Sequence, residues 1–477
     1  MLNVFSNKKM KKILAAASLA AFAAAGIACP ALASIDTQIV MNVDKTVYTI
    51  NGTINTMDTA PYIDKNDRTM VPVRFAAQAL GAKVDWNEED RTVTVQDNDR
   101  AVIFTIDSSD IKTFEIGKKI KESTDTIDTA AVIKDSRTML PLRAVSEALG
   151  ADVDYKEGVI TINKEASESI YDTVSVSNYQ QLELALGSEA STIVLDNFST
   201  AGESYGKLEV TRPVVLDGNG STIDFGIDIK SNGVTVKNFN AVVTDFNKAV
   251  STGGQSNLKN PGDSIVFEVH NHADGEPVII QNNTVFINIP GASNSAVYLA
   301  DESYAEVTGN TLKLENSENN SLERGGVFIG ADVSGKIEGN TIDTTRTAFP
   351  MSPIGLAANM DTLTGAVTVS PITITGNDIK ARYVTKMYAS GQFFGDDNLV
   401  LESSSDFGVR AALMDFVLAL DSNNTYEIIA PYPAEHEDAY VQTRLDSIMA
   451  GGTYFDNNIF FHVEDGKLVR IPAPVAE

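Results

Sequence analysis

Hydrophobic and polar positions divide the chain into two regions with different repeats. In the first region, RTMVPVRFAAQALGAKVDW (68–86) returns as RTMLPLRAVSEALGADVDY (137–155). Within each copy, apolar residues recur every three or four positions between a proline and a glycine, and alternating stretches lie on both sides. These patterns are typical of a short amphipathic helix flanked by strands. They predict two β-β-α-β repeats, about 40–95 and 101–163, packed as one small α+β domain over residues 35–165.

Beyond residue 177, a six-residue phrase recurs: an apolar residue, any residue, Gly or Asn, Asn, any residue, and an apolar residue. Its copies are IQNNTV, VTGNTL, IEGNTI, ITGNDI and FDNNIF, with the fixed asparagine at Asn283, Asn310, Asn340, Asn377 and Asn458. Short alternating stretches flank each copy, and LDGNGS (216–221) is a looser relative. This pattern predicts a right-handed parallel β-helix in which the asparagines stack as a hydrogen-bonded ladder. A β-sandwich with asparagine at its turns is the alternative.

The spacing of the phrase also predicts where the β-helix begins, continues and ends. The gap between the last two copies is long enough to hold another coil, and residues 409–424 are the candidate for it. Amphipathic patterns at 178–187 and 436–452 predict helices that cap the two open ends. The fold class is therefore mainly β, with a linker at 166–176 and the β-helix domain at 177–477.

The first 33 residues have the pattern of an export signal. A basic stretch, KKMKK, precedes an Ala-rich apolar run and the small residues ALA, which predicts cleavage near Ala33 and a secreted or cell-surface location. A retained membrane anchor and lipidation at Cys29 are the alternatives. Cys29 is the single cysteine of the chain, so the exported protein would have no disulfide. No later segment is long and apolar enough to span a bilayer.

Overall charge limits the classes of partner. The formal net charge is −27, and a strongly acidic surface repels nucleic acid and anionic lipid. The same charge is compatible with divalent cations, so calcium is the one cofactor that the composition leaves open. No loop has a recognisable calcium-ligand spacing, and we therefore expect no cofactor.

The doubled stretch resembles the copper amine oxidase-like N-terminal domain. The two RTM phrases carry the resemblance, which covers about residues 40–163 and implies a stalk that lies remote from the metal of the oxidases. Copper sites need imidazole ligands, and residues 35–165 contain no histidine. The nearest match to the sequence that forms the quinone of these oxidases is Asn178-Tyr179-Gln180, which lacks its acidic residue. We therefore expect no amine oxidase activity.

Arginines are the repeated polar residues of the doubled stretch. They stand at Arg68, Arg74, Arg137 and Arg143. One interpretation is a shared site for anions or glycans. The interpretation we favour is structural, because repeated residues in repeated units usually serve the fold. Each arginine would then brace its helix against a strand carboxylate such as Asp85 or Asp154.

Residues 209–243 resemble the opening coils of pectate-lyase-like right-handed β-helix proteins, and the resemblance extends over about 200–400. It implies a fold. Enzymes of this fold use clustered carboxylates, or calcium-binding acids with an arginine base. The residues that match any of these patterns are Asp396, Asp397 and Arg382, and the Gly-His-Gly and Arg-Ile-Lys motifs of the polygalacturonase type are absent.

The densest polar cluster is HNHADGE (270–276). On a strand, His270 and His272 would share one face, and Asp274 or Glu276 could complete a divalent-metal site. The interpretation we favour is a polar loop that binds no metal, because spacing alone fixes no third ligand.

Taken together, these patterns favour a non-catalytic exported protein. The doubled domain would act as a stalk or attachment module, and the β-helix would offer a surface for an extracellular polysaccharide, a glycan or an envelope protein. The aromatic residues that could stack on sugar rings are Tyr383, Tyr388, Phe393 and Phe394. Two alternatives remain: a polysaccharide lyase or glycoside hydrolase, and a structural envelope component.

Overall fold

The computed structural model describes two compact units. The described residues are 37–165, 171–203, 205–250, 263–289, 293–316, 325–330, 332–347, 353–360, 367–368, 371–381, 386–390, 424–428, 461–464 and 467–470. Unit 1 comprises Met1–Phe114 and Glu122–Glu168, and unit 2 comprises Glu115–Lys121 and Ser169–Glu477. The predicted export signal lies outside the described residues. Over the described ranges, no helix has the length and apolar character needed to cross a membrane.

Unit 1 consists of the two sequence repeats, and each repeat is longer than the predicted β-β-α-β unit. The first holds β1 (Thr37–Asn42), β2 (Val47–Ile50), β3 (Thr53–Thr56), β4 (Tyr62–Ile63), β5 (Thr69–Pro72), α2 (Val73–Leu80), β6 (Lys83–Asn87) and β7 (Thr92–Gln96). The second holds β8 (Arg100–Thr105), β9 (Asp110–Ile116), β10 (Ile120–Thr126), β11 (Val132–Lys134), β12 (Arg137–Pro141), α3 (Leu142–Ala148), β13 (Ala151–Lys156) and β14 (Val159–Lys164). Each repeat therefore places five strands before its helix and two after it.

The helices begin and end where the sequence predicts. Pro72 and Pro141 directly precede them, at positions where a missing N–H costs little. Gly81 and Gly150 follow them with φ of 71° and 76°, in the left-handed region that glycine enters without strain. The apolar face of α3, including Val145, is buried in the core of the unit.

The repeats exchange their C-terminal hairpins. The hairpin β13–β14 of the second repeat joins β1–β3 of the first, and β6–β7 of the first joins β8–β10 of the second. A third antiparallel sheet, in the order β11-β12-β5-β4, links the repeats at their centre. There Val71 pairs with Leu140, its own counterpart, while Met70 pairs with Pro141 and Pro72 with Met139. This reciprocal register gives unit 1 a pseudo-twofold symmetry.

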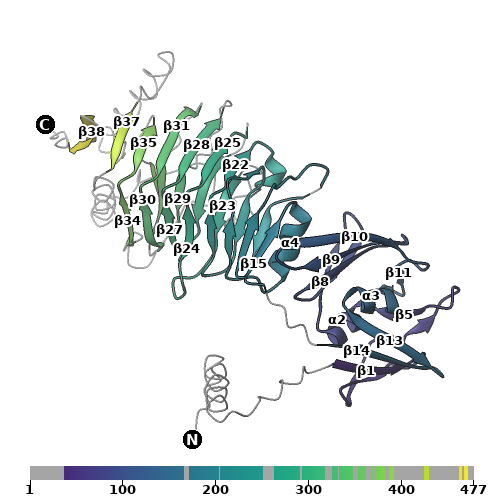
Figure 1. The fold of residues 1–477 in the computed structure, drawn as a ribbon. Helices are drawn as coiled ribbons and strands as arrows, with labels where there is room; N and C mark the ends of the chain where they lie inside the picture. Colours follow the sequence, from purple (N-terminus) through teal and green to yellow (C-terminus); the bar gives the residue numbers. More distant parts are fainter. Residues whose placement is uncertain are drawn as a thin grey trace, which may run out of the picture. The chain divides into compact units, whose positions relative to one another are not determined.

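Unit 2 is built from three parallel sheets (Figure 1). The β15 sheet contains β15 (Thr173–Val176), β16 (Thr192–Leu195), β18 (Val215–Asp217), β21 (Thr235–Lys237), β24 (Val278–Gln281), β27 (Tyr304–Thr308), β30 (Ser334–Glu338) and β34 (Ile372–Thr375). The β19 sheet contains β19 (Thr222–Ile223), β22 (Asn240–Val243), β25 (Thr284–Ile287), β28 (Thr311–Asn316), β31 (Thr341–Thr347), β35 (Asp378–Ala381) and β37 (Thr425–Ile428).

The third sheet, the β17 sheet, also stacks parallel strands, with one antiparallel strand at its end. It contains β17 (Leu208–Val210), β20 (Ile227–Ile229), β23 (Asp263–Val269), β26 (Ser293–Leu299), β29 (Val327–Ile329), β32 (Ile354–Met360) and the antiparallel β33 (Val367–Thr368), and β36 (Lys386–Ser390) pairs parallel to β32. The remaining elements are α4 (Tyr179–Gly187), the 3-10 helix η1 (Phe246–Lys248) and the hairpin β38 (Phe461–Glu464)–β39 (Lys467–Arg470).

From β17 to β32 the chain visits the three sheets in a fixed cycle, and each new strand pairs in parallel with the preceding strand of its sheet. Ile280, Val307, Ile337 and Ile374 are successive register partners in the β15 sheet, and all are buried. Such apolar columns fill the space that the sheets enclose. The mainly β fold class is thus confirmed, and the sheets have the arrangement of a parallel β-helix. Helix α4 lies at the predicted N-terminal cap, with Leu182 and Ala185 buried, whereas the predicted cap at 436–452 lies outside the described residues.

Candidate functional site

An asparagine column runs along the turns that follow the β15 sheet. The backbone N–H and the Nδ2 of Asn283 both donate to Oδ1 of Asn310, at 2.9 and 3.0 Å. The same pair of bonds joins Asn310 to Asn340, Asn340 to Asn377, and Asn377 to Asn424, all at 2.9 Å. Each of these five side chains is buried. The ladder predicted by the repeated phrase is therefore present in the structure.

The ends of the column differ from the sequence pattern. Its fifth member, Asn424, belongs to the hidden coil that the spacing predicts within 409–424, while Asn458 lies outside the described residues. At the other end, the backbone N–H of Phe239 donates to Asn283 Oδ1. The looser phrase does not join, because Asn219 is exposed and adopts a left-handed φ of 49°. The column satisfies backbone groups and is a structural feature.

A charged cluster lies on the outward-facing side of the β17 sheet. Asp228 of β20 and Glu268 of β23 are register partners on neighbouring coils, and both are completely buried. Nε2 of His270 lies 3.1 Å from Glu268 Oε1 and 3.7 Å from Asp228 Oδ1. One ligand-type atom from each residue lies within 4.8 Å of the other two. By residue type, these three side chains could hold a metal ion.

Two lysines balance the carboxylates of this cluster. The ammonium group of Lys207 contacts Glu268 Oε2, and Lys230 lies 3.3 Å from Asp228 Oδ2. Adding a divalent cation would therefore leave a buried excess of positive charge, which is costly in a low-dielectric interior. Buried carboxylates also cannot contact a polymer chain. The geometry is that of an internal ion-pair network.

The candidate metal ligands of the HNHADGE stretch do not lie together in the structure. His270 does meet two carboxylates, but they come from Asp228 and Glu268, and not from Asp274 or a second histidine. Strand β23 ends at Val269, so the HNH stretch lies in a turn, where His272 and Asp274 are exposed. The segments GIDIK and IVFEVH did contain a signal, because each places one acid between buried apolar residues.

The catalytic candidates cannot be placed. Arg382, Asp396 and Asp397 lie outside the described residues, as do Tyr383, Phe393 and Phe394. Tyr388 belongs to β36, but its side chain is not described.

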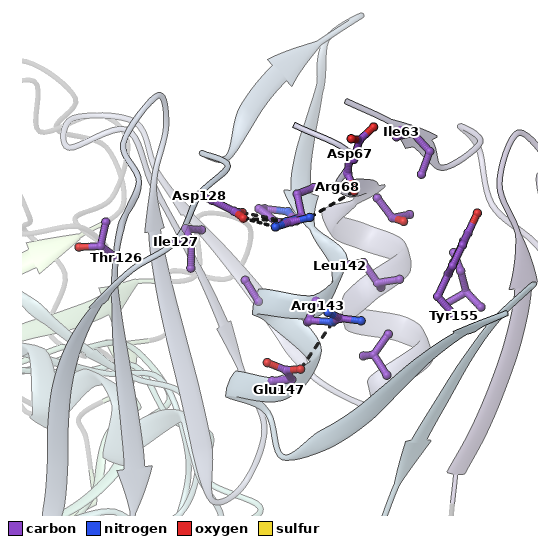
Figure 2. A pocket seen from close by; sticks show the side chains of 15 residues that line it. Ile63, Asp67, Arg68, Thr126, Ile127, Asp128, Leu142, Arg143, Glu147 and Tyr155 are labelled. Atoms are coloured by element: carbon purple, nitrogen blue, oxygen red, sulfur yellow. Dashed lines mark hydrogen bonds and ion pairs between the residues drawn. The ribbon is translucent and has the colours of Figure 1, made fainter. Parts of the chain in front are cut away.

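A pocket of ≈ 680 Å³ lies in unit 1 (Figure 2). Both repeats contribute to it. Its lining residues are Ile63, Asp67, Arg68, Thr69, Thr126, Ile127, Asp128, Pro141, Leu142, Arg143, Ala144, Glu147, Val153, Tyr155 and Ile160. Sequence reasoning missed this pocket, although it had singled out two of its arginines.

The pocket combines an apolar wall with paired charges. The Tyr155 side chain is 51% exposed and that of Ile63 is 41% exposed. Nε of Arg68 donates to both oxygens of Asp128, at 3.0 and 2.8 Å, and these hydrogen bonds lower the pKa of the Asp128 carboxyl. Arg143 lies 3.7 Å from Glu147, one helical turn further on (Figure 2). The pocket thus offers an aromatic face, guanidinium donors and carboxylate acceptors.

The repeated arginines pair across the two repeats. Arg68 of the first repeat binds Asp128 of the second, and Arg137 of the second binds Asp58 of the first at 2.7 Å. Asp58 and Asp128 occupy the same place in the repeat, MDTA in one copy and IDTA in the other. The predicted partners, Asp85 and Asp154, are therefore wrong for these two arginines. A structural role for them agrees with this geometry.

Comparison with known proteins identifies the first region. Searches of curated proteins and of solved structures found no match for the chain. Residues 31–75 and 49–164 match a family described as Copper amine oxidase N-terminal domain. The doubled region, and not the chain as a whole, is thus similar to that domain.

Proposed function

We propose that this protein is an exported, non-catalytic binding protein whose doubled domain attaches it to an extracellular polysaccharide. The observation that carries the proposal is the pocket with an exposed Tyr155 beside Ile63 and the Arg68–Asp128 pair. A sugar ring has flat C–H faces and a rim of hydroxyl groups. An aromatic ring can stack on the C–H faces of the sugar, while guanidinium and carboxylate groups can form hydrogen bonds with its hydroxyl groups.

The β-helix unit supports the proposal as a rigid partner of that domain. We propose that it is a right-handed β-helix of the pectate-lyase-like kind, and that its flank presents a second surface for a glycan or a protein. The buried asparagine column and the register of the sheets support rigidity, because each coil is bonded to the next through both backbone and side chains.

The alternative is a polysaccharide lyase or hydrolase. Acid–base catalysis needs carboxylates that reach the substrate, whereas the acid pair Asp228 and Glu268 is buried and faces two lysines. We therefore expect the purified protein to release neither unsaturated nor reducing sugars from pectin, alginate or envelope polysaccharides.

A glycan array on the chain that begins after Ala33 tests the proposal. We expect binding to at least one polysaccharide, lost in Tyr155→Ala and weakened in Ile63→Ala. The matched control is Ile54→Ala, which removes an exposed isoleucine of β3 that does not line the pocket. Equal loss in the control, binding unchanged in Tyr155→Ala, or sugar release would contradict the proposal.

A further inference from the structure

The pseudo-twofold symmetry of unit 1 gives the pocket a counterpart on the other repeat. Ile63 pairs with Thr69 at one end of the central sheet, and Ile133 pairs with Thr138 at the other. Tyr155 lies opposite Ile160 in the β13–β14 hairpin, and Trp86 lies opposite Val93 in the β6–β7 hairpin. In the sequence, the residues that correspond to the lining of the pocket are Thr56, Met57, Asp58, Pro72, Val73, Arg74, Phe75, Gln78, Val84, Trp86, Val93, Ile133, Ser136, Arg137 and Thr138.

The apolar features of the pocket are repeated at its counterpart. Trp86 is 44% exposed and Ile133 is 51% exposed, close to the values of Tyr155 and Ile63. Exposure of an aromatic residue and an isoleucine at the same two places in both repeats gives both places an apolar surface of the same kind. The ion pair between Arg137 and Asp58 corresponds to the one between Arg68 and Asp128.

The charges of the two places differ. The pocket near Tyr155 holds two arginines and three carboxylates, from Asp67, Asp128 and Glu147. In the sequence, serine stands at the place of the first of these acids and glutamine at that of the third, so that the corresponding positions hold two arginines and one acid. Whereas Arg143 has Glu147 one turn away, the described part of the chain gives the exposed Arg74 no ion-pair partner.

We propose that Trp86, Ile133 and Arg74 form a second sugar-binding site, specific for an acidic sugar such as a uronic acid. The indole would stack on the ring while the guanidinium of Arg74 binds the carboxylate in a bidentate manner. The inference rests on the proposed function and extends it by naming a substrate class. Arg74, which has no ion-pair partner among the described residues, supplies the positive charge for this in a chain of net charge −27.

Two unlike sites on one rigid domain also have a consequence for polymers. A polysaccharide that carries both neutral and acidic sugars could engage both sites at once, and the second contact would then be intramolecular. Binding to the polymer would exceed binding to either short fragment.

Trp86 is the single tryptophan of the chain, so its fluorescence reports on this site alone. The experiment titrates the full exported chain with oligogalacturonate, and in parallel with the same oligomer after methyl esterification, which removes the charge. We expect oligogalacturonate to shift the emission of Trp86, the ester to bind at least about tenfold more weakly, and added salt to weaken the acidic oligomer.

Two variants test whether the guanidinium of Arg74 binds the carboxylate of the sugar. Arg74→Gln removes the guanidinium, and Gln78→Glu places a carboxylate one helical turn from it, as in the second repeat. Each should weaken oligogalacturonate binding about tenfold or more, while Arg91→Gln, which changes an exposed arginine paired with Asp107 outside the pocket lining, leaves it unaltered. Circular dichroism checks that each variant remains folded. Because Gln78→Glu keeps Arg74, loss in both variants cannot be ascribed to a missing structural side chain.

The outcomes separate this inference from the proposed function. An unchanged Trp86 emission with oligogalacturonate, together with glycan binding that depends on Tyr155, would overturn the second site and leave the first. Equal affinity for poly-glutamate would overturn the assignment to sugars. Absence of all glycan binding would overturn both.

Discussion

At the scale of single residues, one position of a six-residue phrase holds the coils together, and its neighbour shapes the turn. The residue before each of the first four column asparagines adopts a left-handed φ, for example 55° at Asn282 and 64° at Gly309. Glycine and asparagine tolerate this region better than other residues. The column asparagine itself is selected because its amide can donate to a carbonyl of the previous coil and accept from that coil's backbone N–H. The two positions of the phrase therefore have separate physical causes.

Removing one amide from the middle of the column should be costly. In Asn310→Ala, the backbone N–H of Asn283 loses its acceptor and the carbonyl of Ile280 loses a donor. Each buried unsatisfied group costs about 1–3 kcal/mol, so the free energy of unfolding of the β-helix unit should fall by about 2–5 kcal/mol in urea titrations. The control is Asn240→Ala, next to the column, where Nδ2 bonds an exposed threonine. Equal effects of the two changes would contradict the ladder's role.

The lowered pKa of the Asp224 carboxyl predicts that the stability of the protein depends on pH. Burial opposes its ionisation, but hydrogen bonds from Lys248 and from the hydroxyl of Tyr205 prevail and hold its pKa below the ordinary 3.8. At pH values between the pKa of Asp224 in the folded chain and its pKa in the unfolded chain, the unfolded chain binds more protons than the folded chain. Stability is therefore fully present above the unfolded pKa and is lost as pH falls toward the folded pKa.

The measurement is the midpoint of thermal unfolding between about pH 5 and pH 2, where carboxylates titrate. Asp224→Asn should flatten the decline with falling pH, and Asp274→Asn, in an exposed turn, should leave its slope unchanged. The same slope in Asp224→Asn and in the parent chain would refute the assignment.

At the scale of elements, the exchange of hairpins makes the two repeats one folding unit. Each outer sheet takes three strands from one repeat and two from the other, and the ion pairs of Arg68 and Arg137 also cross between the repeats. A single repeat has no partner for its own hairpin, so its sheets would expose unpaired edges.

Expression of residues 37–98 alone should therefore yield an unfolded chain, while residues 37–165 should fold cooperatively. Circular dichroism and the dispersion of amide proton shifts in NMR spectra distinguish the two. A cooperatively folded 37–98 monomer would show that hairpin exchange is dispensable. A folded homodimer of 37–98 would be the expected exception, because two identical copies can make the same exchange.

The elements also show how far sequence reasoning extends. Helix ends were predictable because proline and glycine mark them locally, and the coils were predictable because one phrase recurs. The hairpin exchange was not, because β6–β7 satisfies the same alternating pattern whether it pairs within its repeat or across. The pairing of Asp228 with Glu268 depends on coil register, and the 27–81-residue steps between asparagines do not fix register for strands that lack the phrase. The pocket was not predictable because its ion pairs join an arginine of one repeat to a carboxylate of the other, and the sequence does not show that pairing.

At the scale of the whole molecule, the two units differ in where their aromatic and charged side chains lie. Unit 1 exposes Tyr155 and Trp86 at two symmetry-related places, while Asp228 and Glu268 of the β17 sheet in unit 2 are buried in ion pairs. We therefore propose that polysaccharide binds to the doubled domain.

Hydrogen–deuterium exchange of the full exported chain, with and without the polysaccharide that binds best on the array, tests this claim most directly. The account predicts slower exchange in peptides that contain Arg68, Trp86 and the 137–155 stretch, and intact polysaccharide after the incubation. Protection confined to peptides of the β-helix unit, or polysaccharide shortened by the protein, would contradict it.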